Sequence, residues 1–326
     1  MSRRACFNSS YSIRHMTASK HILEHSLKRV VVFQTHELSE ETLQAYRHLK
    51  RSAGSRYQVE LLLDVRSGTT VPPELLSETV CFDSREFASW GLPVMGDTML
   101  PGHCHFPILR YFLANPAIEM LWHVEYDVRF TGAWNLLFDT HESNEADLLC
   151  CHLQNRLDEP QWYWWGSLRG PTSDAPIEAL RNPDRQWRAL LVVSRYSARA
   201  LRTLVEYQRN GWSGHQEVLI PTVLTQAGLK VRDLNGRAVN CEQLRPRRRS
   251  FYWSTSDLTG SMSEFGSIRF RPASLRPGLL SNTLYHPVKP KSMLQKKSLI
   301  SRVFSKLLAA RQILRAMIYR RSRQVN

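Results

Sequence analysis

A strand, a helix and a second strand follow one another closely near the start of the sequence, and this order constrains the fold more than any other feature. Residues 29–36 (RVVVFQTH) and 58–65 (QVELLLDV) are short runs of β-branched and aliphatic residues, as in strands buried within a sheet. Residues 39–50 between them have the periodicity of an amphipathic helix, and Ser39 is placed to cap it. We therefore expect a parallel β–α–β unit.

The same alternation continues along the sequence and predicts an α/β fold, with a mainly parallel central sheet flanked by helices. Further strands are expected at residues 79–82, 120–125, 146–153, 188–194 and 229–234, and further helices at residues 103–113, 133–138, 198–209 and 218–227. We expect one domain over residues 29–289, which follows a disordered polar leader (1–28) and precedes a basic tail (290–326).

Two acidic residues end the central strand. In the stretch EMLWHVEYDVRFTGAW (119–134), an apolar run is followed by Glu125 and Asp127. Residues i and i+2 of an extended chain point to the same side, so both carboxylates are expected to project together. They repel each other unless a cation or a proton intervenes, and Mg²⁺ or Mn²⁺ holding a diphosphate is the economical solution. A solvated turn after an edge strand explains the same two residues equally well.

Other polar side chains occupy comparable positions. Thr35 and His36 end one predicted strand, and Asp64 lies at the end of another. In open α/β sheets, ligands bind beyond the C-terminal ends of the strands. Because these three residues share that position with Glu125 and Asp127, a ligand site at this edge is favoured over the solvated turn.

Glu217 is a candidate general base. It lies in GWSGHQEVLIPT (211–222), where an apolar helix is expected to begin with Ser213 or Gly214 as its cap. The helix dipole keeps a first-turn carboxylate ionised, and such a group facing a cleft can accept a proton. Glutamate is also common there for the dipole alone, and the residue types by themselves favour this structural interpretation.

Two further segments contain basic candidates. Arg247, Arg248 and Arg249 lie in a compact run (RPRRR), which suits a solvated loop or a clamp for phosphate oxygens. His286 and Lys289 lie in LYHPVK, where a lone histidine is usually structural. Neither segment is specific enough to assign a role from residue types.

Aromatic and histidine residues form two local clusters. Residues 161–168 (QWYWWGSL) are expected to pack on the core or form a lid, with stacking on a sugar ring as the minority alternative. His103 and His105 have the HxH spacing of metal ligands. Beside Phe106 and Pro107 at a helix start, they are instead expected to cap the helix or lie at the edge of the core.

The basic excess is concentrated in the tail. The net charge is +15, and residues 289–326 contain eleven Lys and Arg with no acid, so the preceding residues contribute only +4. Apolar residues recur there at helical spacing, which predicts a basic amphipathic helix on an anionic membrane surface. A helix docked on its own domain is the alternative. Nucleic-acid binding is disfavoured, because the tail has few aromatic residues and no nucleic-acid-binding motif.

Composition argues against several classes of protein. No run of about 18 apolar residues is present, so no transmembrane helix is expected, and residues 1–28 lack the apolar segment of a secretory signal. The six cysteines form no CxxC pair, which argues against a zinc site or a disulfide framework. Reduced cysteines are typical of a cytoplasmic protein.

Residues 101–140 resemble the glycosyltransferase-like proteins of the nucleotide-diphospho-sugar transferase (GT-A) fold. The specific part is WHVEYDVRFTGAW (122–134), to which Pro101-Gly102 and His105-Phe106-Pro107 add. The order of elements is similar over residues 29–289, but the resemblance is strong only over the shorter segment. It implies a single GT-A-like, Rossmann-related domain.

The resemblance also implies a role for each candidate. Glu125 and Asp127 would hold Mn²⁺ or Mg²⁺ on the donor diphosphate, with Glu in place of the first acid of the commoner DxD motif. His286 matches a late histidine that binds metal or diphosphate, and Glu217 matches the base of inverting members. In members without a metal, basic side chains neutralise the diphosphate, here Arg247, Arg248, Arg249 and Lys289.

We therefore expect a glycosyltransferase that moves a sugar from a nucleotide-diphosphate donor to a hydroxyl of a glycan or glycolipid, with inversion. The nucleoside would bind near Thr35, His36 and Asp64, and the enzyme would be cytoplasmic and peripheral on the inner face of the membrane. A non-catalytic sugar-nucleotide or glycan-binding protein is the alternative. A glycoside hydrolase is disfavoured, because Glu125 and Asp127 are too close to flank a glycosidic bond.

Overall fold

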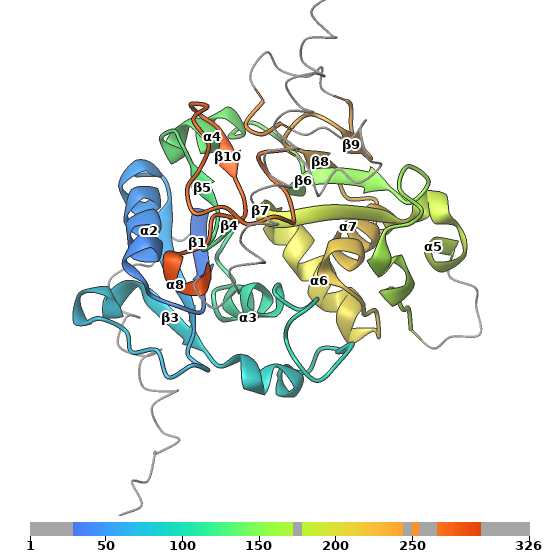
Figure 1. Cartoon of the computed structure of the whole chain (residues 1–326). Coiled ribbons are helices and arrows are strands. Elements are labelled where there is room, and N and C mark those ends of the chain that lie inside the picture. The colour runs from blue at the N-terminus through green and yellow to red at the C-terminus, as the bar shows by residue number, and fades with distance from the viewer. Residues whose placement is uncertain (1–28, 172–177, 244–249, 254–265, 295–326) are drawn as a thin grey trace, which may run out of the picture.

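The computed structural model describes residues 29–171, 178–243, 250–253 and 266–294. These residues form an α/β fold around an eight-stranded sheet with the strand order β3-β2-β1-β4-β7-β6-β8-β9 (Figure 1). All the strands expected from the sequence are present, and β9 is additional. In chain order the strands are β1 (Arg29–Thr35), β2 (Gln58–Asp64), β3 (Thr79–Phe82), β4 (Met120–Glu125), β6 (Leu148–Asn155), β7 (Trp187–Ser197), β8 (Val231–Asp233) and β9 (Ala238–Val239).

The sheet is mainly parallel, as expected. β3, β2, β1 and β4 pair in parallel, and so do β6 and β8, whereas β7 runs antiparallel to both of its neighbours. The reversal of β7 follows from its connection, since residues 156–186 leave the end of β6 and return where Asn155 pairs with Trp187. This connection includes η3 (Tyr163–Ser167), α5 (Glu178–Arg181) and η4 (Pro183–Arg185).

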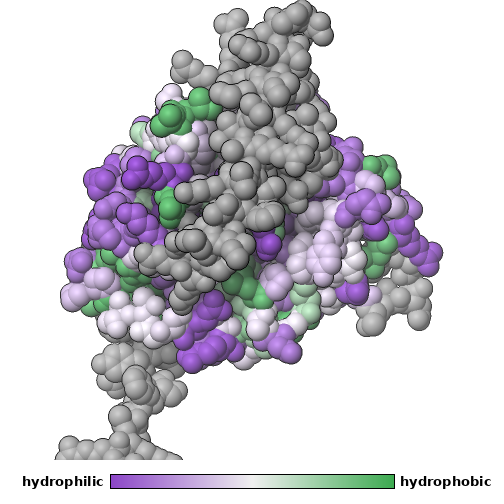
Figure 2. Space-filling model, in the orientation of Figure 1, coloured by the Kyte–Doolittle hydropathy of each residue, from purple (hydrophilic) through white to green (hydrophobic). Residues whose placement is uncertain are grey.

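Helices cover both faces of the sheet. One face is covered by α2 (Glu40–Ser52) and α4 (Trp134–Thr140), and the other by α3 (Phe106–Ala114), α6 (Ala198–Arg209) and α7 (Gln216–Gln226) (Figure 1). Successive side chains of β1 point to opposite faces of the sheet and pack in both cores. Val30 and Val32 pack in the core with α3, α6 and α7, and Val31 and Phe33 pack in the core with α2 and α4. The outer surface over α2 is mainly hydrophilic, as its amphipathic pattern requires (Figure 2).

Most helices begin where local sequence signals place them. Ser39 caps α2 through the Thr42 N–H, and Ser197 caps α6 through the Ala200 N–H. The helix expected from residue 103 begins instead at Phe106, because Pro107 suits only the first turn of a helix. His103 and His105 are buried in the turn before it, so the core-edge interpretation is confirmed, while His105 makes no side-chain cap.

A second, two-stranded sheet joins distant parts of the sequence. β5 (Arg129–Phe130) pairs antiparallel with β10 (Leu284–Tyr285), and a short helix, α8 (Lys291–Leu294), follows. The pairing places residues 286–289 next to the end of β4. The predicted leader and the tail beyond residue 294, with its expected amphipathic helix, lie outside the described residues. Among the helices that are described, none has the length and apolar character needed to cross a membrane.

Asp147 is a buried carboxylate that links the start of β6 to neighbouring segments. It accepts hydrogen bonds from Ser197 Oγ at 2.8 Å, Arg199 Nη2 at 2.7 Å and the Lys230 N–H at 2.9 Å. Burial alone would raise the pKa of Asp147, but the Arg199 guanidinium and these hydrogen bonds hold it below its usual value. Asp147 therefore ionises more readily in the folded protein than in the unfolded chain. The resulting stability is present above about pH 4, the unfolded pKa, and is lost as the pH falls through the folded pKa.

Asp147→Asn is expected to lower the free energy of unfolding by about 2 kcal/mol at neutral pH, because buried donors lose a charged acceptor. The difference from wild type should shrink as the pH is lowered from about 5 toward 3. Urea denaturation at several pH values measures both effects. Asp184→Asn, at an exposed acid of η4, is the control and should change stability by less than about 0.5 kcal/mol. A pH-independent loss in Asp147→Asn would contradict the electrostatic explanation.

Candidate active site

The C-terminal ends of three adjacent strands meet at one edge of the sheet. β2, β1 and β4 lie side by side in parallel, and β4 ends opposite the end of β1. The structure therefore brings Thr35, His36, Asp64 and Glu125 to the same edge, as the sequence predicted. This is the edge at which α/β sheets bind ligands.

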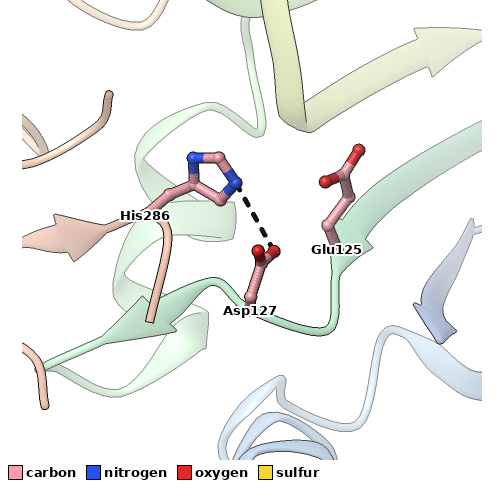
Figure 3. A group of neighbouring side chains, drawn as sticks. All are labelled: Glu125, Asp127 and His286. Atoms are coloured by element: carbon pink, nitrogen blue, oxygen red, sulfur yellow. Dashed lines mark ion pairs between the residues drawn. The ribbon is translucent and has the colours of Figure 1, made fainter. Parts of the chain in front are cut away.

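Glu125, Asp127 and His286 form a single group at this edge (Figure 3). One ligand atom from each residue, a carboxylate oxygen or a ring nitrogen, lies within 4.8 Å of the other two. Within the described part of the chain, this is the one group of three such side chains that could hold a metal ion. The convergence of these residues, predicted from separate segments, is therefore observed.

Asp127 reaches the group through a turn and not through strand alternation. β4 ends at Glu125, whose carbonyl accepts a hydrogen bond from the Val128 N–H at 3.0 Å. The Asp127 carbonyl in turn accepts from the Val288 N–H at 2.7 Å. The expectation that both acids belong to one extended strand is thus wrong, because the segment after β10 binds the turn and sets the direction of Asp127.

Asp127 is held ionised by two basic groups. Its side chain is 2% exposed, yet Lys289 Nζ lies 2.6 Å from Oδ2 and His286 Nε2 lies 3.4 Å from Oδ1. Burial alone would raise the pKa of Asp127, but the charges of His286 and Lys289 hold it well below its usual range. Oδ1 has no hydrogen-bond partner within the described residues. One oxygen of a buried carboxylate therefore remains available to a ligand.

His286 is oriented by a backbone carbonyl. Its Nδ1 lies 2.7 Å from the Arg269 carbonyl, which can only accept, so Nδ1 carries the proton and Nε2 faces Asp127. Burial would lower the pKa of His286, but the adjacent Asp127 carboxylate raises it. Without a metal this favours the imidazolium form, which pairs with Asp127. A bound metal would take the place of the Nε2 proton and use the Nε2 lone pair.

A bound cation would change the protonation of Glu125 more than that of Asp127. Burial, and then repulsion from Asp127, raises the pKa of Glu125 to about 7. The half-buried Glu125 carboxylate, the buried Asp127 carboxylate and one imidazole nitrogen fit a divalent cation that takes oxygen and nitrogen ligands, since Asp127 Oδ1 accepts no hydrogen bond from the described residues. The residues present therefore fit the predicted divalent cation.

Lys289 connects the group of Glu125, Asp127 and His286, called here the acidic group, to the residues predicted to bind the nucleotide. Its Nζ also lies 2.6 Å from the Tyr126 hydroxyl and 4.6 Å from the centre of the Tyr126 ring. The His36 ring packs edge-on against the same tyrosine at 4.8 Å. Burial lowers the pKa of His36, and the charges of Lys289 and Arg66 lower it further. His36 is therefore favoured in its neutral form, next to the positive charges of Lys289 and Arg66. A charged ligand that binds beside Asp127 would act on His36 as well.

Thr35 and Asp64 are engaged in local turns at the strand ends. Thr35 Oγ1 donates to the Glu37 carbonyl at 2.7 Å. Asp64 Oδ1 accepts from the Arg66 and Ser84 N–H groups, each at 3.1 Å, and Oδ2 lies 3.3 Å from Arg66 Nε. The sequence pointed to Asp64 but not to Arg66 or Tyr126. Tyr126 was missed because strand alternation predicts that it faces away from the two acids.

Glu217 lies in the first turn of α7, as expected, but the cap is different. His215 caps the helix, since its Nδ1 accepts from the Glu217 N–H at 3.3 Å, and neither Ser213 nor Gly214 does so. Gly214 (φ +143°) lies instead against the backbone of Ser167 at the end of η3. The helix begins at Gln216, two residues before the expected start at residue 218, and its cap lies one or two residues after the expected cap.

Glu217 has the protonation behaviour of a base near neutrality. Its side chain is 14% exposed, and burial raises its pKa to about 7, with Glu125 adding to the rise while Arg188 and His286 oppose it. Burial of the thiol raises the pKa of Cys104, and the carboxylates of Glu125 and Glu217 both raise it further. Glu217 thus belongs to the same electrostatic neighbourhood as the acidic group.

Arg188 is a site neighbour that the sequence did not reveal. It lies in β7 and is fully buried, donating to Gln154 Oε1 at 2.7 Å and pairing with Glu159. The sequence predicted an apolar strand over residues 188–194 and gave no sign that its first residue is a buried arginine. By contrast, Arg247, Arg248 and Arg249 lie outside the described residues, and their phosphate-binding role stays a prediction.

The chain matches no family model and no curated protein by sequence. Solved structures do match with probability 1.00. One is the apo-form glycosyltransferase GlyE of Streptococcus pneumoniae TIGR4, at 15% identity over 63% of this chain and 44% of GlyE, with a TM-score of 0.31. This chain therefore spans less than half the length of GlyE.

Two other matches cover more of the compared protein. The galactosyltransferase LgtC, in complex with donor and acceptor sugar analogues, matches at 10% identity over 60% of this chain and 70% of LgtC, with a TM-score of 0.35. The 4-diphosphocytidyl-2C-methyl-D-erythritol synthase of Anaerococcus prevotii matches at 8% identity over 68% of this chain and 92% of that protein, with a TM-score of 0.34. The matching structures include glycosyltransferases, as the resemblance of residues 101–140 implies. Every TM-score quoted is below 0.5, so these likenesses do not assign a function to the chain.

Proposed function

We propose that this protein is a glycosyltransferase that uses a nucleotide-diphosphate sugar as its donor. The observation that carries the proposal is the group of Glu125, Asp127 and His286, with Lys289, at the C-terminal edge of the sheet. This combination of two carboxylates, an imidazole and an amine can bind a cation together with phosphate oxygens. A purely structural ion pair of Asp127 with Lys289 and His286 would not require Glu125. The raised pKa of Glu125 indicates that ionising this second carboxylate at the site costs free energy.

The leaving diphosphate is the group that most needs stabilisation, because negative charge builds on it while an oxocarbenium-like centre forms. Glu125, Asp127 and His286 would hold a divalent cation, Mn²⁺ or Mg²⁺, which when bound supplies positive charge to the phosphate oxygens. Lys289 lies against Asp127 and would contact the same oxygens as a second positive charge. The nucleoside would lie along the ends of β1 and β2, near Thr35, His36 and Asp64.

Glu217 would be the general base of an inverting displacement. Its carboxylate takes the proton from the acceptor hydroxyl as that oxygen attacks the anomeric carbon and the bond to the diphosphate breaks. A pKa of about 7 supports this assignment, because such a carboxylate is substantially ionised at neutral pH and remains basic enough to accept a proton. The acceptor would be a hydroxyl of a glycan or glycolipid.

We place the protein in the cytoplasm, at the inner face of the membrane, through the basic tail. Met293 Sδ lies 3.3 Å from the Tyr126 hydroxyl, so a truncation must keep α8 to leave the site intact. Deleting residues 295–326 is expected to release the protein from anionic liposomes in a sedimentation assay, since most of the basic residues of the tail lie there. Undiminished liposome binding by the truncated protein would contradict the tail's role.

Donor binding tests the proposal directly. The full chain is screened by thermal shift against UDP-, GDP- and dTDP-sugars, with CMP-sugars as a monophosphate comparison, each with and without Mn²⁺. One class of diphosphate donor is expected to raise Tm in a Mn²⁺-dependent way, because ligand binding stabilises the folded state by mass action. A shift without Mn²⁺ would transfer the diphosphate-binding role to Lys289 and Arg247–Arg249. The absence of a shift with every donor would refute the proposal.

A further inference from the structure

Three aromatic residues beside α7 lie at the edge of the core or outside it, and Trp162 packs against the core. Trp162 and Trp164 are half-buried and Tyr163 is 80% exposed, whereas the adjacent Trp165 is buried. The Trp164 ring stacks on His215 at 4.5 Å with an interplanar angle of 18°, and Tyr163 meets Trp164 edge-on at 4.6 Å. Trp162 approaches His215 at 6.1 Å. We call Trp162, Tyr163, Trp164 and His215 the aromatic wall.

The aromatic wall is fixed to the start of α7. Arg169 and Ser213 exchange two backbone hydrogen bonds, at 2.9 and 3.0 Å, and the His215 N–H donates to Ser167 Oγ at 3.0 Å. A side chain on Gly214 would lie 3.0 Å from the Ser167 carbonyl oxygen, so the two segments approach too closely for any other residue. The wall is therefore held in a defined position and is unlike a free surface loop.

That position is next to the proposed base. His215 forms part of the wall and also caps α7, and its Nδ1 lies 4.0 Å from Glu217 Oε2. On the inner side of the wall, the buried Arg188 guanidinium lies 5.1 Å from the centre of the Trp162 ring. Through His215, the wall therefore reaches to within 4.0 Å of the Glu217 carboxylate.

We propose that the aromatic wall is the acceptor subsite and that it binds a pyranose ring. The C–H groups of a sugar face are apolar and stack on aromatic rings, while the hydroxyls at the ring edge stay free to react. The acceptor class is therefore a saccharide, and a simple lipid alcohol lacks the ring that the wall selects. This inference rests on the proposed function for the reaction, in which one hydroxyl on the stacked ring loses its proton to Glu217 and displaces the nucleoside diphosphate.

Saccharide binding can be measured without any donor. Saturation-transfer NMR is recorded on the full chain with methyl β-glucoside, methyl β-galactoside, methyl α-mannoside and methyl β-N-acetylglucosaminide, and with open-chain sorbitol as comparison. Ring protons of at least one pyranoside are expected to receive saturation from wild type and from Trp164→Phe, which retains a stacking face. Trp164→Ala should lose about five- to tenfold in affinity for that pyranoside. Leu76→Ala, which removes a 62% exposed side chain of η1 on the β3 side of the sheet, should bind as wild type does.

The kinetic readout separates the wall from the donor site. With a donor that binds, Trp164→Ala should raise KM for the pyranoside about five- to tenfold and leave donor KM and donor hydrolysis within about twofold. Pyranoside binding by wild type with no binding of any donor would refute the proposed reaction but uphold the wall as a saccharide site. No saturation of any pyranoside, or equal saturation in Trp164→Ala, would overturn the inference.

Discussion

Replacing Asp127 with asparagine is expected to lower kcat by about 10²- to 10³-fold while the protein remains folded. Asparagine has nearly the same shape but no charge, so both Lys289 and His286 lose the carboxylate that faces them. The group at the sheet edge then has one acid instead of two. Unlike at Asp147, stability should change little, because the Lys289 side chain is 30% exposed and can turn to solvent, and because Glu125 is freed from the repulsion of Asp127.

Release of nucleoside diphosphate from the donor measures this effect, with thermal denaturation as the folding check. Asp139→Asn is the matched control, since it is the same change at an exposed residue of α4 that pairs with Arg56. The control should keep wild-type activity. Normal turnover by a well-folded Asp127→Asn protein would contradict the role of the acidic group.

Glu217→Gln is expected to reduce kcat by about 10²- to 10⁴-fold, the range over which general bases contribute. Wild-type activity should fall as the pH drops below about 7, because the carboxylate that must accept a proton is then already protonated. The glutamine variant should have a low rate that does not follow this titration. Its folding should be retained, since the His215 cap uses the backbone N–H of residue 217 and not its side chain.

Full pH–rate profiles of wild type, Glu217→Gln and Glu206→Gln provide the test. Glu206 is an exposed glutamate of α6, and its replacement should leave both rate and profile unchanged. The profile also distinguishes two groups with similar pKa values. If Glu217→Gln kept the acid limb, Glu125 would be the titrating group, because its pKa is also about 7, and Glu217 would not be the base.

Those parts of the fold that depend on local signals could be predicted from the sequence. The β1–α2–β2 unit was predicted because its strands are continuous apolar runs and Ser39 caps the helix between them. α6 was placed at residues 198–209, where Ser197 is the cap. The reversal of β7 could not be predicted, since it depends on how the connection of residues 156–186 folds back, and that connection carries no strong periodicity.

The candidate site was predictable as a set of residues and not as a geometry. Glu125, Asp127 and His286 were each singled out, and they meet. Their meeting depends on the pairing of β5 with β10, two-residue strands about 150 positions apart that are too short to leave a pattern. The same pairing places Lys289 against Asp127. Arg188 was hidden for a different reason, because a buried ion pair with Glu159 cannot be inferred from an apolar strand.

The reaction products test the central claim most directly. The full chain with Mn²⁺ is incubated with the donor that stabilises it and with pyranoside acceptors, and ³¹P NMR follows the phosphorus-containing products. The account predicts that nucleoside diphosphate appears together with a new glycoside, and that both are lost in Asp127→Asn. A parallel incubation supplies a nucleoside triphosphate and a sugar 1-phosphate instead of the nucleotide sugar. Pyrophosphate formed there, with the nucleotide sugar left intact in the first incubation, would contradict the account.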